Sequence, residues 1–163
     1  MACRSPHAGV DTLIVVASSD PGVVSDDPTA ISVLAVTTDD VVTALEANER
    51  RDASAVLRVT PPFSGRMRAR LHLDGAEDDY GDPAPIHLSP ERFLDRVPAF
   101  PAPDDTEDEI RSDPGATYSP DEHRRRHEAA VEAWRRSVRE SMLEGTTVPT
   151  PEGPHSVRVT TLG

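Results

Sequence analysis

The chain has 163 residues, enough for one modest domain, and its 16 prolines and 4% aromatic residues predict a small core with long irregular connections. The formal net charge is -12, with 29 acidic residues against 17 basic ones, and all of those basic residues are arginines. The single cysteine, Cys3, excludes a disulfide framework and a cysteine-based metal site within one chain, and the apolar runs are far shorter than the roughly 20 residues that span a bilayer.

The composition also indicates the environment in which the protein works. Lysine and glutamine are absent and asparagine occurs once, at Asn48, so Asp, Glu, Arg, Ser and Thr solvate most of the surface. Dense carboxylates keep a chain hydrated in molar salt, which favours a cytosolic protein of an extreme halophile. We therefore predict a cytoplasmic protein with no membrane partner. An acidic surface that binds a basic partner is the alternative interpretation of the charge.

The first half of the chain predicts an extension, two strands and a helix. Residues 1–29 are rich in Pro, Gly, Asp and Ser and predict a flexible N-terminal extension. Residues 30–37, AISVLAVT, have the β-branched content of a strand, and residues 38–50 follow as a helix capped by Thr38. Residues 54–60, SAVLRVT, predict the next strand.

The stretch SGRMRARLHLDG, residues 64–75, alternates between apolar and basic positions, which is the period of a half-buried antiparallel strand. It predicts a hairpin with residues 54–60. The apolar positions are expected to face the core, and they are Met67, Ala69, Leu71 and Leu73. The other positions form an unusual row, which consists of Arg66, Arg68, Arg70 and His72.

The middle of the chain predicts little regular structure. Residues 85–89, PIHLS, predict a short strand, and a short helix capped by Ser89 follows. Residues 96–118 predict an acidic, proline-rich loop with at most one helical turn near residues 106–110.

The most clearly predicted element, a long helix, lies in the last part of the chain. Residues 119–144 predict a long helix, because Ser119 and Glu122 have capping-box spacing and apolar residues recur every three or four positions. That apolar stripe, expected to lie across the sheet, consists of Val131, Trp134, Val138 and Met142. Residues 146–163 predict a hairpin or a single strand, with PEGP as the turn. Together the elements predict a single α+β domain over residues 30–163, with an antiparallel sheet of about four or five strands packed against one long C-terminal helix and a shorter N-terminal helix.

The arginine row supplies the candidate site. With a fifth residue from the neighbouring strand, the candidate ligand-binding residues are Arg58, Arg66, Arg68, Arg70 and His72. Guanidinium groups offer paired donors that match phosphate and carboxylate, so the expected ligand is anionic: a nucleic acid, a phosphate or an acidic protein segment. The alternative is that the arginines pair with carboxylates of the protein itself.

The histidines support a second, enzymatic hypothesis. His123 and His127 lie one helical turn apart, and with His72 or His87 they could serve a metal-dependent hydrolase if three of them converge. The helix lacks an HExxH motif, and the chain has no GxSxG or nucleotide-binding glycine loop. Carboxylates are too abundant to single out an acid or base, so no catalytic residue, metal or cofactor is assigned.

Three stretches resemble a known family: LAVTTDDVVTALEANERRDASAVLRVTPPFSGRMRARLHL at 34–73, AFPAPDDTEDEIRSD at 99–113 and HEAAVEAWRRSVRES at 127–141. The chain resembles a family of small haloarchaeal proteins known only as a domain of unknown function, over about residues 30–163. The resemblance implies a haloarchaeal lineage and a cytosol adapted to high salt. It implies no activity, cofactor or catalytic residue.

The favoured function is therefore that of a non-enzymatic binding or accessory protein that uses the arginine row. The histidine-based hydrolase is one alternative. The other is an interaction module in which the 119–144 helix pairs with a second copy through Trp134. The oligomeric state stays open.

Overall fold

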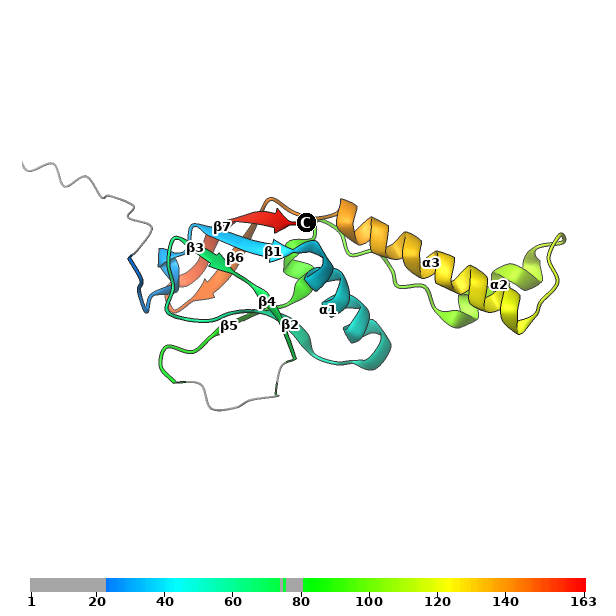
Figure 1. The fold of residues 1–163 in the computed structure, drawn as a ribbon, viewed down its shortest axis with the longest axis horizontal. Coiled ribbons are helices and arrows are strands. Elements are labelled where there is room, and N and C mark those ends of the chain that lie inside the picture. The colour runs from blue at the N-terminus through cyan, green and yellow to red at the C-terminus, as the bar shows by residue number, and fades with distance from the viewer. Residues whose placement is uncertain (1–22, 74, 76–80) are drawn as a thin grey trace, which may run out of the picture.

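The computed structural model describes residues 23–73, 75 and 81–163, so most of the predicted N-terminal extension lies outside the described residues. Figure 1 shows a body of strands from which two helices extend. In chain order the elements are η1 (Pro28–Ala30), β1 (Val33–Thr37), α1 (Thr38–Arg51), β2 (Ala55–Val59), β3 (Arg66–Arg68), β4 (Arg70–Leu73), β5 (Ile86–Leu88), η2 (Pro90–Phe93), α2 (Pro103–Ser112), α3 (Pro120–Glu140), β6 (Gly145–Thr150) and β7 (Gly153–Leu162).

The fold is α+β, as predicted, but the strands form two sheets instead of one antiparallel sheet. The larger sheet has the order β3-β1-β7-β6 and the smaller one β4-β2-β5. In the larger sheet β1 runs parallel to both β3 and β7, while β6 and β7 form the predicted C-terminal hairpin. Parallel pairs join strands that are far apart in the sequence. The local alternation of apolar and polar residues identifies a strand, but it does not show which distant strand it pairs with.

The predicted strand over residues 64–75 is two strands that belong to different sheets. β3 pairs with β1 of the larger sheet, and β4 pairs antiparallel with β2 of the smaller one. The change occurs at Ala69, which is fully buried and donates its N–H to the carbonyl of Ala35 at 2.9 Å. The small side chain of alanine suits this position, because it lies in the hydrophobic core at the point where the chain passes from one sheet to the other.

The expected core face of that stretch is only partly buried. Ala69 is buried and Met67 packs partly against the core, but Leu71 and Leu73 are 37% and 52% exposed. Leu71 lies opposite the buried Leu57, so it does point to the core side. It is exposed because β4 is an edge strand, which leaves one flank of its side chains uncovered.

Helix α1 covers the core between the two sheets. Its buried residues include Val41, Val42, Ala44 and Leu45. The N-cap is Thr37, whose hydroxyl accepts a hydrogen bond from the N–H of Asp40, and the predicted cap Thr38 is the first helical residue. At the other end the side chain of Asn48 accepts from the N–H of Ala55 and donates to its carbonyl, which ties the helix to β2.

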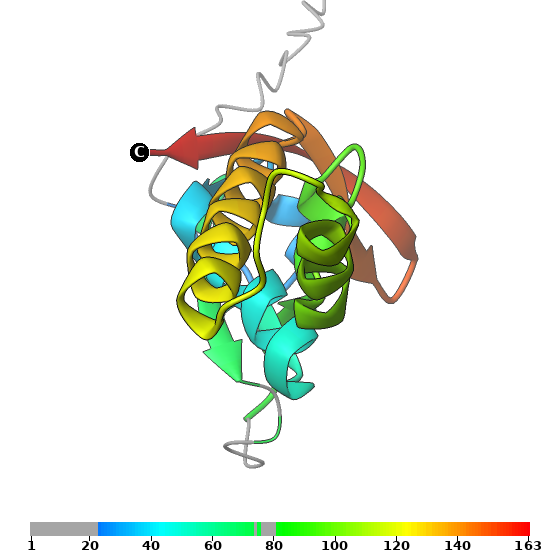
Figure 2. The same cartoon turned by 90° about the vertical axis from the view of Figure 1, so that its right-hand side faces the viewer.

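Helix α3 confirms the predicted long helix, but it does not lie across the sheet. The helix ends at Glu140, and its first half extends away from the strands beside α2 (Figures 1 and 2). Its second half is anchored by Trp134, which is 4% exposed, stacks edge-on with Phe100 and donates its indole N–H to the carbonyl of Pro98 at 3.0 Å. Trp134 is therefore a core anchor that rests on an irregular segment.

The segment predicted as an acidic loop contains the ten-residue helix α2 where at most one turn was expected. Pro103 occupies its first turn together with Asp104 and Asp105, an arrangement that favours helix initiation. Only two of its side chains, Thr106 and Ile110, are buried. Two buried positions make too weak a periodic signal to identify the helix without its partner α3.

Two short predicted elements are present. The short strand near 85–89 is β5, and the short helix after it is η2, although Ser89 makes no side-chain capping bond. Across the described ranges, none of the helices combines the length and the apolar character needed to cross a membrane.

Candidate anion-binding surface

Arg66 and Arg68 lie on the outer side of the larger sheet. In the pairing of β3 with β1, Arg66 lies opposite Val33 and Arg68 opposite Ala35, while Met67 lies opposite the fully buried Leu34. Side chains alternate along a strand, so the two arginines point away from the core and are exposed.

The other three candidate residues lie on the smaller sheet. Arg58 of β2 is opposite Arg70 of β4, and His72 is opposite Val56. Arg58 and His72 are half-buried, and Arg70 is exposed. The five predicted residues, called the arginine face below, are therefore divided between two sheets.

A depression joins the two parts of the arginine face. It has a volume of about 460 Å³, and its rim brings together Arg68 from β3 and Arg58, Arg70 and His72 from the smaller sheet. Thr60, Met67 and Leu71 complete the lining. Arg66 is not part of it and extends the face along β3, about 7 Å from Arg68 at the usual rise of an extended chain. The structure thus places three arginines and one histidine around one hollow, with a further arginine beside it.

Most arginines of α1, α2 and α3 are engaged in ion pairs. Seven of them have a carboxylate oxygen within 4.0 Å of a guanidinium nitrogen: Arg50, Arg111, Arg124, Arg125, Arg126, Arg135 and Arg139. The pairing with Arg135 holds the pKa of Glu46 below its usual value, and Arg125 and Arg126 do the same for Glu122. Most of these carboxylates lie three or four residues away on the same helix, as helical geometry favours.

The exposed arginines of the sheets differ from those of the helices. No carboxylate in the described ranges pairs with Arg66, Arg68 or Arg70 within the same distance. Their neighbours across the strands are Val33, Ala35 and another arginine, so the sheets supply no acidic partner at these positions.

The structure adds two residues that the sequence analysis did not assign to this surface. Arg158 of β7 lies opposite Val33 from the other side, so it shares the outer face with Arg66 at about 10 Å, two strand spacings away. His87 of β5 lies opposite Arg58, and its ring is 5.5 Å from that of His72. Arg158 alternates with Val157 and Val159, which signals a strand, but only the parallel pairing of β7 with β1 places it here.

The histidines do not form a common centre. His123 and His127 stack 6.0 Å apart and help to join α3 to α2, where His123 contacts the carbonyl of Pro103 and His127 the hydroxyl of Thr106. His72 and His87 belong to the smaller sheet. Among the residues with described positions, no three His, Cys, Asp or Glu side chains are arranged to hold a metal ion. The convergence that the hydrolase hypothesis requires is therefore not present in that part of the chain.

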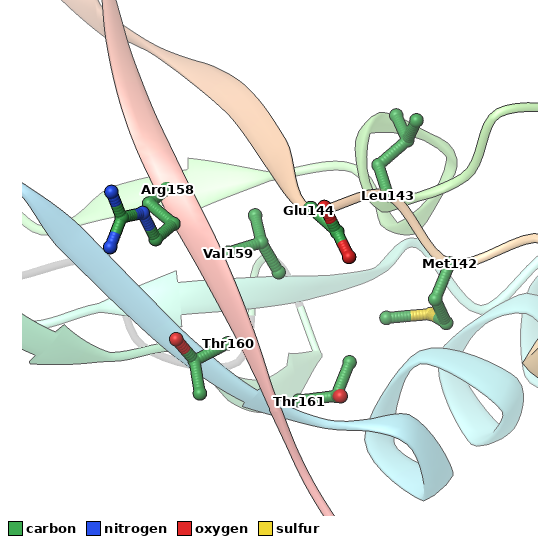
Figure 3. Close-up of a pocket in the computed structure, with 7 residues that line it drawn as sticks. All are labelled: Met142, Leu143, Glu144, Arg158, Val159, Thr160 and Thr161. Atoms are coloured by element: carbon green, nitrogen blue, oxygen red, sulfur yellow. The ribbon is translucent and has the colours of Figure 1, made fainter.

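A second depression lies between the end of β7 and residues 142–144 (Figure 3). It has a volume of about 540 Å³, and the side chains of Glu144 and Met142 line it opposite Val159 and Thr161. Arg158 and Thr160 point to the other side of the strand. A carboxylate on the rim makes this depression a poor site for an anion, and it holds no pair of groups suited to acid–base chemistry.

Comparison with known proteins gives one match. The model of a family described as a domain of unknown function, DUF8009, matches residues 21–163. The match begins at residue 21, earlier than the resemblance near residue 30, and so includes part of the segment assigned to an extension. Neither curated proteins nor solved structures yielded a match.

Proposed function

We propose that this chain, which belongs to the DUF8009 family, is a binding protein whose arginine face holds the phosphate backbone of a nucleic acid. The observation that carries the proposal is the contrast between helix and sheet arginines. Seven arginines on α1, α2 and α3 have carboxylate partners, although Arg51 and Arg136 do not within the described part of the chain, whereas Arg66, Arg68 and Arg70 are all exposed and lack one there.

The arrangement suits a polyanion better than a single phosphate. Arg68, Arg70 and Arg58 surround one hollow, and Arg66 and Arg158 continue the positive surface across the larger sheet. A ligand with repeated charges can contact several of these side chains at once, and each guanidinium can bind a phosphate through two donors.

Binding is expected to depend little on base sequence. The residues of the arginine face include no Phe, Tyr or Trp, the side chains on which unpaired bases stack. Contacts to phosphate fix the position of a nucleic acid without reading its bases. We therefore infer a general backbone-binding role and not recognition of a particular sequence.

We further propose that the protein works in the cytoplasm of a halophilic archaeon. The absence of lysine, the single cysteine and the net charge of -12 support this proposal. In molar salt the Debye length is about 3 Å, so long-range attraction is screened and binding relies on close contacts between guanidinium and phosphate.

The test is fluorescence anisotropy of labelled single-stranded RNA and DNA, titrated with the protein over a range of KCl concentrations up to molar. The test variant changes Arg66, Arg68 and Arg70 to serine. We expect saturable binding by the natural protein. In the variant we expect weaker binding and a salt dependence, d log K/d log[salt], reduced by about 2, since each lost phosphate contact removes about 0.7.

The matched control changes Arg111, Arg124 and Arg139 to serine, which removes the same charge from exposed arginines that have carboxylate partners. This control should bind as the natural protein does. An equal loss of affinity in both variants would show that binding depends only on net charge, and it would refute a specific binding site on the arginine face. Binding to polyglutamate without binding to nucleic acid would replace the proposed ligand with an acidic protein segment.

A further inference from the structure

The strands of this acidic chain carry no acidic side chain. The seven strands that the structure describes contain no Asp or Glu, and all of their ionisable side chains are Arg or His. The carboxylates are concentrated elsewhere, and α2 alone carries five in its ten residues. The strand surfaces are therefore the part of this chain that repels a polyanion least.

On the outer side of the larger sheet, two polar rows flank the short side chains of β1. The rows consist of Arg66 and Arg68 on β3 and of Arg158 and Thr160 on β7, and all four residues are exposed. Val33 of β1 lies between Arg66 and Arg158. In the next outward position, Ala35 lies between the other two. The rows are two strand spacings apart, about 10 Å between Cα atoms. These six residues are called the β1 strip below.

The β1 strip faces away from the core, and its arginines lack internal partners. On the other side of the same strands, Leu34, Val36 and Val159 are buried in the main hydrophobic cluster, to which α1 and α3 also contribute. Throughout the described ranges, no carboxylate lies within 4.0 Å of the guanidinium of Arg158, as for the two arginines of β3. Arg158 thus offers its donors to a ligand from the opposite side of β1.

Two rows on either side of a strip match the geometry of a duplex better than that of a single strand. A duplex presents two phosphate strands that flank each groove, and the grooves of B-DNA are about 6 and 12 Å wide. The separation of the rows, about 10 Å, falls within that range, so arginines from each row can contact a different phosphate strand. A single strand that follows β3 would leave Arg158 without a contact.

The residues of the β1 strip also favour paired bases. None of them is aromatic, so an unpaired base finds no side chain on which to stack. A duplex keeps its own stacking and needs only contacts to its backbones. We propose that the nucleic acid bound by the arginine face is double-stranded, with Arg66 and Arg68 on one phosphate strand and Arg158 on the other. This inference rests on the proposed function and adds the class of nucleic acid to it.

The first test compares duplexes with their separate strands by fluorescence anisotropy. The probes are a labelled DNA duplex, the RNA duplex of the same sequence and one strand of each, titrated at the same KCl concentration. We expect the natural protein to bind at least one duplex about tenfold more tightly than its single strand, the gain from one further charge-assisted contact. The tighter of the two duplexes shows whether the rows match B-form or A-form geometry.

The second test removes one row. In Arg158→Ser we expect the affinity for the duplex to fall about tenfold, and its salt dependence to fall by about 0.9, the value of one phosphate contact in a duplex. The affinity for the single strand should stay unchanged, because that strand contacts β3. The matched control is Arg136→Ser, which removes an exposed arginine of α3 that also lacks a carboxylate partner in the described part of the chain. Circular dichroism checks that each variant is folded.

Three results would overturn the duplex proposal: equal affinity for duplex and single strand, an equal loss of both in Arg158→Ser, or the same loss in Arg136→Ser. In the first two cases the protein still binds a single strand, so the proposed function stands while the class of ligand is wrong. If the natural protein binds none of the four probes, the proposed function itself is refuted.

Discussion

The helical pair α2 and α3 should open without unfolding of the sheets, and Ile110→Ala tests this. Ile110 is 1% exposed, yet it is not part of the main hydrophobic cluster that joins α1, both sheets and Trp134. Polar contacts supply the other links between the two helices, chiefly His123 with the carbonyl of Pro103 and the ion pair between Arg126 and Asp113. The pair thus has a small core of its own.

The expected cost follows from the burial of this side chain. Replacing a fully buried isoleucine with alanine costs about 2–5 kcal/mol, from lost apolar burial and from the cavity that remains. Two helices with only two buried side chains on α2 cannot hold a large local stability, because most helical stability comes from packing. The substitution should therefore open α2 and the first half of α3 in a large fraction of molecules.

Native-state hydrogen exchange measures this directly. In Ile110→Ala, we expect the amides of residues 104–130 to lose protection, while those of β1 and β7 keep theirs. Leu34→Ala is the control: Leu34 is fully buried in the main cluster, so its loss should lower protection throughout the molecule. If Ile110→Ala lowers protection equally in helices and sheets, the chain is one cooperative unit and the reasoning fails.

Two further predictions concern single contacts. Hydrogen bonds from Arg135 hold the pKa of Glu46 below the ordinary value of 4.5, so this pair stabilises the folded chain above pH 4.5, and the contribution is lost as the pH falls through the lowered pKa. The difference in unfolding free energy between the natural protein and Glu46→Gln, from urea titrations, should therefore shrink below pH 4.5; a constant difference would contradict the assignment. Thr37→Ala should lower the free energy of unfolding by about 1 kcal/mol through loss of the helix cap, and Thr37→Ser should restore most of it. No effect of Thr37→Ala would mean that the cap is not needed.

The sequence predicted those elements whose signals are local. α3 was identified because its capping residue and its apolar stripe lie within one helix, and Ser119 does accept the N–H of Glu122. The hairpin of β6 and β7 was identified for the same reason, since the turn and both strands are contiguous. α1 was placed to within about a residue, although its cap was assigned to Thr38 instead of Thr37.

The features that the sequence did not reveal depend on contacts between distant segments. Residues 66–73 read as one strand because the alternation continues through Ala69, and nothing local marks the point where the chain passes from one sheet to the other. Helix α2 gains its buried side only from α3, and Arg158 joins the outer face only through parallel pairing with β1. The direction in which Arg66, Arg68 and Arg70 point was predictable from period two, whereas their lack of a carboxylate partner in the described ranges was not.

Arginines on the helices and arginines on the strands differ in whether a carboxylate lies near them in the same element. On the helices a carboxylate lies three or four positions from most arginines, so the charge is balanced within the same element. On β3 and β4 every second residue from Arg66 to Arg70 is an arginine, and Arg70 faces Arg58 across the strands. The described neighbours of Arg66 and Arg68 across the strands are Val33 and Ala35, which offer no charge compensation. An anionic ligand would supply that compensation, so ligand binding should raise the stability of the sheets as well as occupy the face.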